Sequence, residues 1–412
     1  MNNTIKLAVA AALLAGASSA SAGIMIPAGD WTLDIGGIVN AYYTHTNASG
    51  NDLEGAGTLG GDTEFRNADS VSNITTGLLP NYLSVSGKTR QNDLDVGFTI
   101  SINPGASTTQ SGQQNNPNNQ ENRQAFLTFG DKSWGSIKVG KDLGIYASDA
   151  ILNDMTLLGV GSGAGLLAGN TTTLGRIGTG FMYADWKSQI AYSSPNWNGF
   201  SFTAGVTQAW NSWGVLGGLS ATSDGRGGSS PAFEGKASYE WAGDVGGKVW
   251  ASALTQKVED LSSTTSVSGR TDDRATAFDI GVTVNVAGFG LTGYYGEGSG
   301  SGTTVLLRDG FDATGNDRDS DDWYVQGTYT LPGVGTKLGV SYGKSTLDGN
   351  GANDLLDEYS NRMWTVGAYH PITKHLNLVA EYSDVKTELE FDGTPNFDGK
   401  SKTIALGAIL FF

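Results

Sequence analysis

Apolar and polar residues alternate with a period of two along most of the chain. Between Trp31 and Tyr43 every second residue is apolar or glycine, and the residues between them are largely polar. The same alternation runs from Leu94 to Ile102. Successive side chains of a β-strand point to opposite faces, so this period predicts strands with one apolar face and one polar face.

Segments with strand character occur sixteen times, and the connections between them alternate in length. The predicted strands span 31–43, 79–89, 93–102, 121–129, 135–141, 181–194, 199–208, 232–242, 246–256, 274–285, 288–298, 321–330, 336–345, 361–370, 375–384 and 400–412. The long connections span 44–78, 103–120, 142–180, 208–231, 256–274, 300–320, 346–360 and 385–398. Short turns on one side, long loops on the other and an even strand count are typical of a transmembrane antiparallel β-barrel. The predicted fold class is therefore all-β.

The composition agrees with a barrel in lipid. Only 38% of the residues are hydrophobic, which is little for one buried core in 412 residues. The conflict disappears if apolar side chains face lipid and polar ones line water. After residue 22 there is no apolar run of the length that a transmembrane helix needs. A soluble β-sandwich would also alternate, but it does not explain eight long polar loops on one side.

The first 22 residues have the pattern of a secretory signal peptide. Lys6 precedes an apolar run over 7–15, and Ala20-Ser21-Ala22 forms an A-x-A cleavage site. We therefore predict export and a single barrel domain over 23–412. The absence of cysteine argues against a disulfide-stapled secreted scaffold. A formal charge of −16 disfavours nucleic acid as a partner, because phosphate contacts need Lys and Arg.

The connection 142–180 is too long for a turn and too rich in glycine for one continuous helix. Loops of this length inside a compact domain are usually functional or disordered. We predict that this third long loop folds into the lumen of the barrel and narrows the channel there.

Four stretches of the sequence resemble the sixteen-stranded general porins of Gram-negative bacteria. They are RQAFL at 123–127 followed by WGSIKVGK at 134–141, IAYSSP at 190–195 followed by NGF at 198–200, GAY, ITKHL and AEYS between 367 and 383, and the terminal Phe412. Two departures are that Lys141 and His375 stand where arginine is usual, and that the PEFGG signature of enteric porins is missing from 142–180.

The resemblance implies a homotrimeric, water-filled channel of the outer membrane for ions and small hydrophilic solutes. It also implies contact with outer-membrane lipid and lipopolysaccharide. In this family the terminal phenylalanine is part of the signal that the barrel-assembly machinery reads.

Five charged residues are candidates for the channel constriction. Asp149 and Asp154 are the carboxylates of the long loop that could face the gap. Lys88 and Lys138 have the parity of lumen-facing strand residues, and Arg176 could reach the gap from the end of the loop. Charges of opposite sign on facing walls create a transverse field that orders water and dipolar solutes. A solvated charge at the rim is the alternative for each of them.

Two neighbouring long connections are acidic. Their carboxylates are Asp309, Asp312, Asp317, Asp319, Asp321 and Asp322 in one, and Asp348, Asp354, Asp357 and Glu358 in the next. Such a mouth concentrates cations, so we predict a mild cation preference, with a merely solvated acidic surface as the alternative. These carboxylates could also hold Ca²⁺ and bridge lipopolysaccharide, although their spacing does not match an EF-hand. No other cofactor is predicted.

We predict that the protein is not an enzyme. The glycines between Gly159 and Ala164 lie outside a βαβ context, the three histidines have no metal spacing, and no GxSxG motif is present. A substrate-specific channel for sugars or organic acids is the alternative function, with four tyrosines of inward parity as a possible aromatic ladder: Tyr42, Tyr82, Tyr294 and Tyr324. An outer-membrane enzyme or adhesin is the third reading.

Overall fold

The computed structural model describes residues 23–50, 70–106, 120–162, 172–214, 225–261, 271–351, 354–393 and 395–412. Its strands are β1 (Ile24–Ala28), β2 (Trp31–Gly50), β3 (Ser70–Thr75), β4 (Tyr82–Gln91), β5 (Leu94–Pro104), β6 (Gln120–Glu121), β7 (Ala125–Asp131), β8 (Gly135–Leu143), β9 (Trp186–Ser193), β10 (Phe200–Thr207), β11 (Ala232–Trp241), β12 (Val245–Leu261), β13 (Thr271–Val286), β14 (Phe289–Ser299), β15 (Asp319–Thr330), β16 (Lys337–Asp348), β17 (Leu356–Pro371), β18 (Leu376–Phe391) and β19 (Phe397–Phe411). The predicted signal peptide lies outside the described residues. No helix in the described part of the chain is long and apolar enough to cross a membrane.

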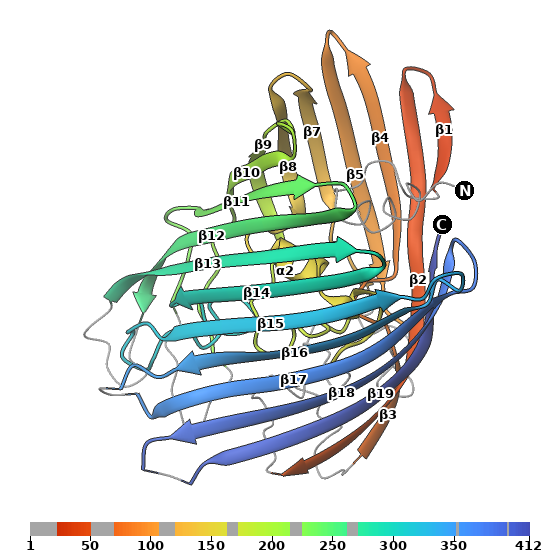
Figure 1. Ribbon diagram of the computed structural model, residues 1–412. Coiled ribbons are helices and arrows are strands. Elements are labelled where there is room, and N and C mark those ends of the chain that lie inside the picture. Colours follow the sequence, from red (N-terminus) through yellow and green to blue (C-terminus); the bar gives the residue numbers. More distant parts are fainter. Residues whose placement is uncertain are drawn as a thin grey trace.

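The strands from β2 to β19 form one closed antiparallel barrel (Figure 1). β3 and β4 pair with the two halves of β2, and β6 and β7 pair with β5, so each of these couples forms one interrupted barrel strand. The barrel therefore has the predicted sixteen strands. Closure occurs between β19 and β2, from Gly399 opposite Gly50 to Phe411 opposite Ile38. Closure matters because each unsatisfied backbone group in lipid costs several kcal/mol.

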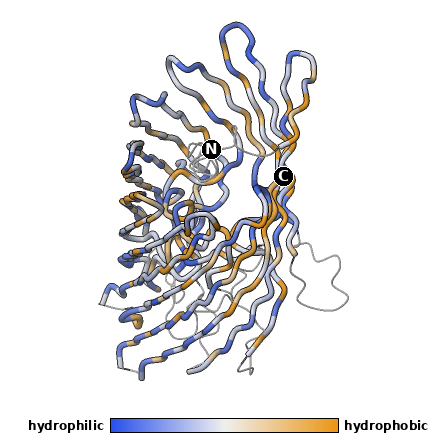
Figure 2. Tube along the Cα trace, turned by 45° about the vertical axis from the view of Figure 1, so that its right-hand side comes forward, coloured by the Kyte–Doolittle hydropathy of each residue, from blue (hydrophilic) through white to orange (hydrophobic). Residues whose placement is uncertain are grey.

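The two faces of the barrel wall differ in polarity, as the alternation predicted. On β15 and β16 the outward residues Val325 and Val340 are 49% and 54% exposed, whereas the neighbouring Tyr324, Gln326 and Ser341 are buried. Figure 2 shows apolar and polar residues alternating along the strands. An outer wall of exposed apolar side chains is stable only against lipid.

At the end of the barrel that carries the long connections, several strands are longer than predicted. Asp319, Asp321 and Asp322 belong to β15, Asp348 belongs to β16, and Asp357 and Glu358 belong to β17, so these acids are not in loops. The connection predicted at 385–398 shrinks to 392–396, because β18 and β19 continue as a ladder to Leu389 opposite Phe397. The apolar alternation stops earlier, since these strand ends carry polar side chains on their outer face.

Two further differences lie near the strand starts. β1 was not predicted; it pairs with β2 from Ile24 opposite Ile35 to Ala28 opposite Trp31. The strand predicted at 181–194 begins only at Trp186. Phe181 and Tyr183 are instead buried in an apolar cluster with residues of the long connection before them.

A charge on the outer wall is expected to destabilise the barrel. Val340→Arg places a cation on the lipid-facing row of β16 and should lower the free energy of unfolding by about 2–4 kcal/mol. Leu355→Arg is the matched control, because Leu355 is 57% exposed in the connection after β16 and should change stability by less than about 0.5 kcal/mol. Urea unfolding in lipid vesicles measures both variants. Equal stabilities would contradict a lipid-facing Val340.

Candidate functional site

The connection between β8 and β9 lies against the inner wall of the barrel. Its described residues, 144–162 and 172–185, are called the inner segment and contain α2 (Ser148–Leu152) and the 3-10 helix η3 (Met155–Leu158). The Tyr324 hydroxyl donates to the Ala150 carbonyl at 2.8 Å. Gln326 accepts from the Met155 amide at 2.9 Å and donates to the Asn153 carbonyl at 2.6 Å. Tyr324 and Gln326 are both on the buried face of β15. The inner segment therefore contacts a strand that is more than 170 residues away in the sequence (Figure 1).

Two buried wall carboxylates hold consecutive backbone amides of the inner segment. Glu234 of β11 accepts from the amides of Ile145 and Tyr146 at 2.8 and 2.9 Å, and from the ammonium of Lys187 at 2.7 Å. Glu381 of β18 accepts from the amides of Val160 and Gly161 at 2.7 and 2.8 Å. A carboxylate can accept several hydrogen bonds, and such charge-assisted bonds are stronger than neutral ones. The segment is thereby fixed near its start and near Val160.

The break between β3 and β4 provides another attachment. The amide of Leu78 donates to the Gly159 carbonyl at 2.8 Å, and the amide of Thr173 donates to the Gly77 carbonyl at 3.1 Å. Asn40 of β2 supports the break, because its side chain accepts from the Gly77 amide at 2.9 Å. A barrel strand thus loses its regular pairing where its backbone bonds to the inner segment.

The tyrosines of inward parity serve the same segment. The Tyr42 hydroxyl donates to the Leu158 carbonyl at 2.6 Å. Tyr294 and Tyr324 stack with ring centroids 5.2 Å apart and pack on Phe181. Tyr42, Tyr294 and Tyr324 are buried, so they support the inner segment, and an aromatic ladder along open water gains no support from them.

A second connection, 300–318, also packs on the inner segment. The Thr304 amide donates to the Gly180 carbonyl at 3.2 Å, and the Tyr183 amide donates to the Thr304 carbonyl at 2.7 Å. Arg318 forms two hydrogen bonds to the carboxylate of Asp354, at 2.5 and 2.7 Å, and both side chains are buried. This ion pair joins the connection 300–318 to the next one, 349–355.

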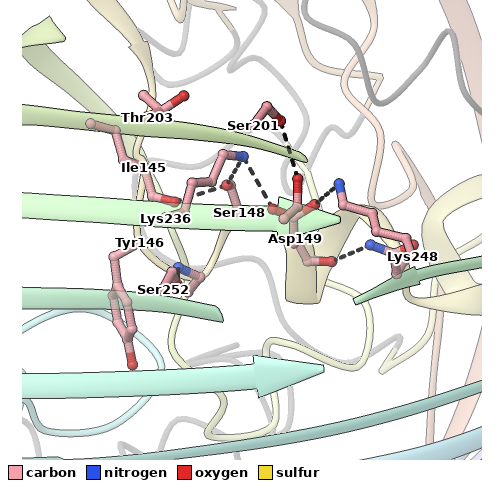
Figure 3. A network of polar contacts seen from close by, with 12 residues as sticks. Ile145, Tyr146, Ser148, Asp149, Ser201, Thr203, Lys236, Lys248 and Ser252 are labelled. Atoms are coloured by element: carbon pink, nitrogen blue, oxygen red, sulfur yellow. Dashed lines mark hydrogen bonds and ion pairs between the residues drawn. The ribbon is translucent and has the colours of Figure 1, made fainter. Parts of the chain in front are cut away.

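Asp149 lies at the centre of a network of charges (Figure 3). It stands in the first turn of α2, and its carboxylate contacts the ammonium groups of Lys236 at 3.2 Å and Lys248 at 2.5 Å. Lys236 also donates to the Ser148 hydroxyl at 2.8 Å. Burial by itself raises the pKa of Asp149, but the two lysines outweigh it and hold this pKa below the ordinary value of 3.8. Asp149 is therefore ionised at neutral pH.

The lysines keep contact with solvent while the aspartate does not. The side chain of Asp149 is 4% exposed, whereas those of Lys236 and Lys248 are 28% and 15% exposed. Lys248 also meets Glu240, which is 54% exposed, at 3.3 Å. The solvent-accessible part of the network therefore consists of Lys236, Lys248 and Glu240, and Asp149 is buried beneath them.

The structure separates the other predicted constriction residues. Asp154 is buried and caps η3, accepting from the Thr156 amide at 3.0 Å. Arg176 is fully buried and donates to the Met363 carbonyl at 3.0 Å; burial lowers its pKa, against nearby Asp154. Lys138 pairs with Asp142 and lies over the ring of Phe126. Lys88 is exposed near the turn after β4.

Of the five predicted residues, Asp149 lies at the centre of this network. Its partners Lys236 and Lys248 were missed. The signal for Lys236 was present, because it alternates with the exposed Phe233 and Tyr239 rows of β11. Lys248 lies on β12, where the apolar Trp250 and Leu254 have the same parity as Lys248 and obscure the alternation.

Metal ligands do not gather among the described residues: these contain no group of three or more His, Asp or Glu that could hold a metal ion. Calcium binding by the acidic connections stays a prediction. Asp309, Asp312 and Asp354 are buried.

A closed barrel with an apolar outer wall and a polar interior is the architecture of an outer-membrane channel. The model of the Gram-negative porin family matches residues 8–389, and the chain belongs to this family. Family and fold thus define a channel for small solutes in the outer membrane. A search of curated protein sequences gave no significant match.

Solved porin structures share the fold at low sequence identity. The outer-membrane channel DcaP of Acinetobacter baumannii has a TM-score of 0.66 and 17% identity, covering 95% of this chain and 100% of that one. The anion-selective porin of Comamonas acidovorans has a TM-score of 0.60 and 14% identity, covering 93% and 100%. The trimer form of OmpT of Vibrio cholerae has a TM-score of 0.57 and 14% identity, covering 93% and 99%.

Removal of a wall carboxylate is expected to release the inner segment. Glu381→Ala deletes the acceptor of two amides, so hydrogen exchange at Val160 and Gly161 should accelerate at least tenfold, which corresponds to about 1.4 kcal/mol. Glu390→Ala, on the outward face of the same strand, is the control and should leave both amides unchanged. Unchanged exchange in Glu381→Ala would show that the carboxylate does not hold the segment.

The contribution of Asp149 should depend on pH. Because its folded pKa lies below 3.8, its ionised form stabilises the fold above that pH and loses this effect as the pH falls through the folded pKa. Asp149→Asn should cost about 1.5–3 kcal/mol at pH 7. The difference from the unsubstituted protein should vanish in strong acid.

Glu240→Gln is the matched control, because Glu240 contacts the same Lys248 but is exposed. Its cost should stay below about 1 kcal/mol. Urea unfolding at several pH values measures both variants, and a cost of Asp149→Asn that is independent of pH would refute the lowered pKa.

Proposed function

We propose that this porin is a passive diffusion channel for ions and small hydrophilic solutes, and that residues 142–180 narrow it. The observation that carries the proposal is the attachment of the inner segment to the walls on several sides, through Glu234, Tyr324, Gln326 and Glu381. A segment fixed in this way keeps the cross-section of the channel constant. Its charges also keep fixed positions, which selectivity by a charged constriction requires.

The charges of the constriction are those of the Asp149 network. Lys236 and Lys248 are the solvent-contacting cations, and Glu240 is an exposed anion beside Lys248 on the same wall. Lys236 and Lys248 thus take the role that the sequence assigned to Lys88, Lys138 and Arg176. Lys138 remains half-exposed beside Asp142 and adds a further cation to the wall.

We keep a mild cation preference as part of the proposal, with a narrower basis than the sequence suggested. Asp309, Asp312 and Asp354 are buried, and Asp354 is paired with Arg318, so they add little to the field at the mouth. Its remaining support is the exposed Asp357 at the long-connection end. Asp319 and Asp348 are exposed as well, but they stand on the outward rows of β15 and β16. The lysines of the constriction act in the opposite direction.

The setting proposed for the channel is a homotrimer in the outer membrane, reached after cleavage of residues 1–22. The trimer form of OmpT, which shares the fold, supports the oligomeric state. Contact with lipopolysaccharide and recognition of Phe412 by the barrel-assembly machinery complete the proposal. The alternative of a sugar- or acid-specific channel has less support, because three of the four inward tyrosines, Tyr42, Tyr294 and Tyr324, are buried.

Planar-bilayer conductance of the refolded protein tests the proposal. We expect stepwise openings in groups of three. In a KCl gradient, the sign of the reversal potential should indicate selectivity for cations. Current that saturates or is blocked by one solute would favour the substrate-specific channel. A folded barrel that carries no current would contradict the channel.

Lys236→Gln tests the constriction itself. Removing this cation should move the reversal potential toward cation selectivity by on the order of 10 mV, out of about 59 mV for a perfectly selective channel in a tenfold gradient. Lys402→Gln is the control, because Lys402 is exposed on the outer face of β19. Equal shifts in both variants would argue against a constriction beside Asp149.

A further inference from the structure

Two buried aspartates of the inner wall flank a glycine. Asp279 of β13 and Asp322 of β15 stand directly opposite Gly296 of β14, one on each side of it. Their relative exposures are 0% and 8%, on rows that face the interior. Neighbouring strands lie about 4.8 Å apart, so the Cα atoms of the two aspartates are roughly 10 Å apart. We call Asp279 and Asp322 the buried pair.

One oxygen of each aspartate supports the inner segment. Asp322 accepts from the Met182 amide at 3.2 Å. Asp279 accepts from the Ser252 hydroxyl at 2.6 Å, and Ser252 in turn accepts from the Ala147 amide at 3.1 Å. The buried pair therefore supports the segment both near its start and near its end.

The remaining oxygens of the buried pair have no such role. Oδ2 of Asp279 and Oδ1 of Asp322 are buried without a hydrogen-bond partner in the described part of the chain. The hydroxyl of Tyr294 on β14 is a third such atom, on a residue that is 5% exposed. A methyl group placed at Gly296 would lie 2.5 Å from Oδ1 of Asp322 and 2.6 Å from the Tyr294 hydroxyl. These two oxygens therefore converge over the glycine, close enough to interact but without the geometry of a hydrogen bond.

The lysines of this wall are already engaged elsewhere. Lys236 and Lys248 contact Asp149, and Lys248 also contacts Glu240, so two lysines face two carboxylates (Figure 3). The charges of Asp149 and Lys236 act on Asp279 in opposite directions. The network thus leaves no positive charge for the buried pair. Ionised carboxylates that are buried without compensation are costly, so the pair requires either a cation or protons.

We propose that the buried pair binds a calcium ion, with Oδ2 of Asp279, Oδ1 of Asp322 and the Tyr294 hydroxyl as ligands. Ca²⁺ takes oxygen ligands at about 2.3–2.6 Å in a flexible geometry, and water fills the remaining positions. Two ligand oxygens on opposite sides of the ion are thus about 5 Å apart. This separation suits two side chains that approach each other from Cα atoms roughly 10 Å apart. Gly296 leaves room between them, because a side chain there would meet both converging oxygens.

The ion joins β13 to β15 and, through them, fixes Ala147 and Met182 of the inner segment. Tyr146 covers the same place, because burial and then the charges of Asp279 and Asp322 raise the pKa of Tyr146. Calcium thus adds, from within the barrel, to the fixation that the constriction needs. The site is independent of the passage of solutes: a barrel that carries no current would still bind the ion.

Terbium luminescence of the intact, mature protein tests the site. Tb³⁺ replaces Ca²⁺ on oxygen ligands and luminesces when a neighbouring tyrosine is excited. The metal-stripped protein should give saturable luminescence that Ca²⁺ abolishes and an equal concentration of K⁺ does not. Asp279→Asn and Asp322→Asn should each weaken Ca²⁺ binding by at least about tenfold, since even residues that only orient a metal ligand contribute that much. Tyr294→Phe keeps both charges and should weaken binding less than either.

Asp321→Asn is the matched control. Asp321 is the neighbour of Asp322 on β15 but stands on the outward row, opposite Glu297 and Thr346. The variant removes the same charge from the same strand and should keep the Ca²⁺ affinity. Equal losses in Asp321→Asn and in the variants of the buried pair would assign the binding to the acidic surface and overturn the site.

Hydrogen exchange of the unsubstituted protein decides the question even where an asparagine variant does not fold. With Ca²⁺ a hundredfold above its Kd, exchange that requires release of the ion slows by up to about a hundredfold. The amides of Ala147 and Met182 should therefore exchange at least about tenfold more slowly in Ca²⁺ than in EGTA. Equal exchange in both, or no saturable binding by the unsubstituted protein, would mean that protons neutralise the pair. Calcium binding without current would refute only the channel, so the two failures are seen separately.

Discussion

Closure of the backbone hydrogen-bond ladder between β19 and β2 is the constraint on which the rest of the structure depends. In lipid no water is present to satisfy a strand edge, so an open sheet would leave a row of unpaired groups. The ladder from Gly399 to Phe411 removes that edge. Once the sheet is closed, alternation alone decides which side chains meet lipid and which line the interior. The apolar wall and the polar lumen both follow from it.

The interior has a different problem, because the inner segment has little regular structure of its own. Its amides need acceptors, and the walls supply them through Glu234, Gln326 and Glu381. The strand break at 76–81 supplies backbone partners as well. Charged acceptors inside a barrel are expensive unless they are fully bonded, and Glu234 meets this condition with two amides, Lys187 and Thr207. Glu381 meets it with two amides and the hydroxyl of Tyr369.

The sequence predicted what depends on period and length, and missed what depends on pairing across the lumen. The sixteen strands follow from alternation that each strand carries by itself, as between Trp31 and Tyr43. The partners of Asp149 are 87 and 99 residues further along, on strands whose inner faces meet α2 only in the closed barrel. Arg176 misled the prediction because its place in a loop says nothing about burial. Strand ends such as 385–391 were missed because polar residues there continue the ladder without an apolar row.

The wall contacts of the inner segment also set an order of events during assembly. Tyr324 and Glu381 are 174 and 221 residues downstream of the atoms that they hold. Contacts of such long range form late, since the chain between them must first be placed. The segment therefore has no binding surface until the C-terminal strands stand in the wall. The narrowing proposed for this segment therefore requires the C-terminal strands to be in place first.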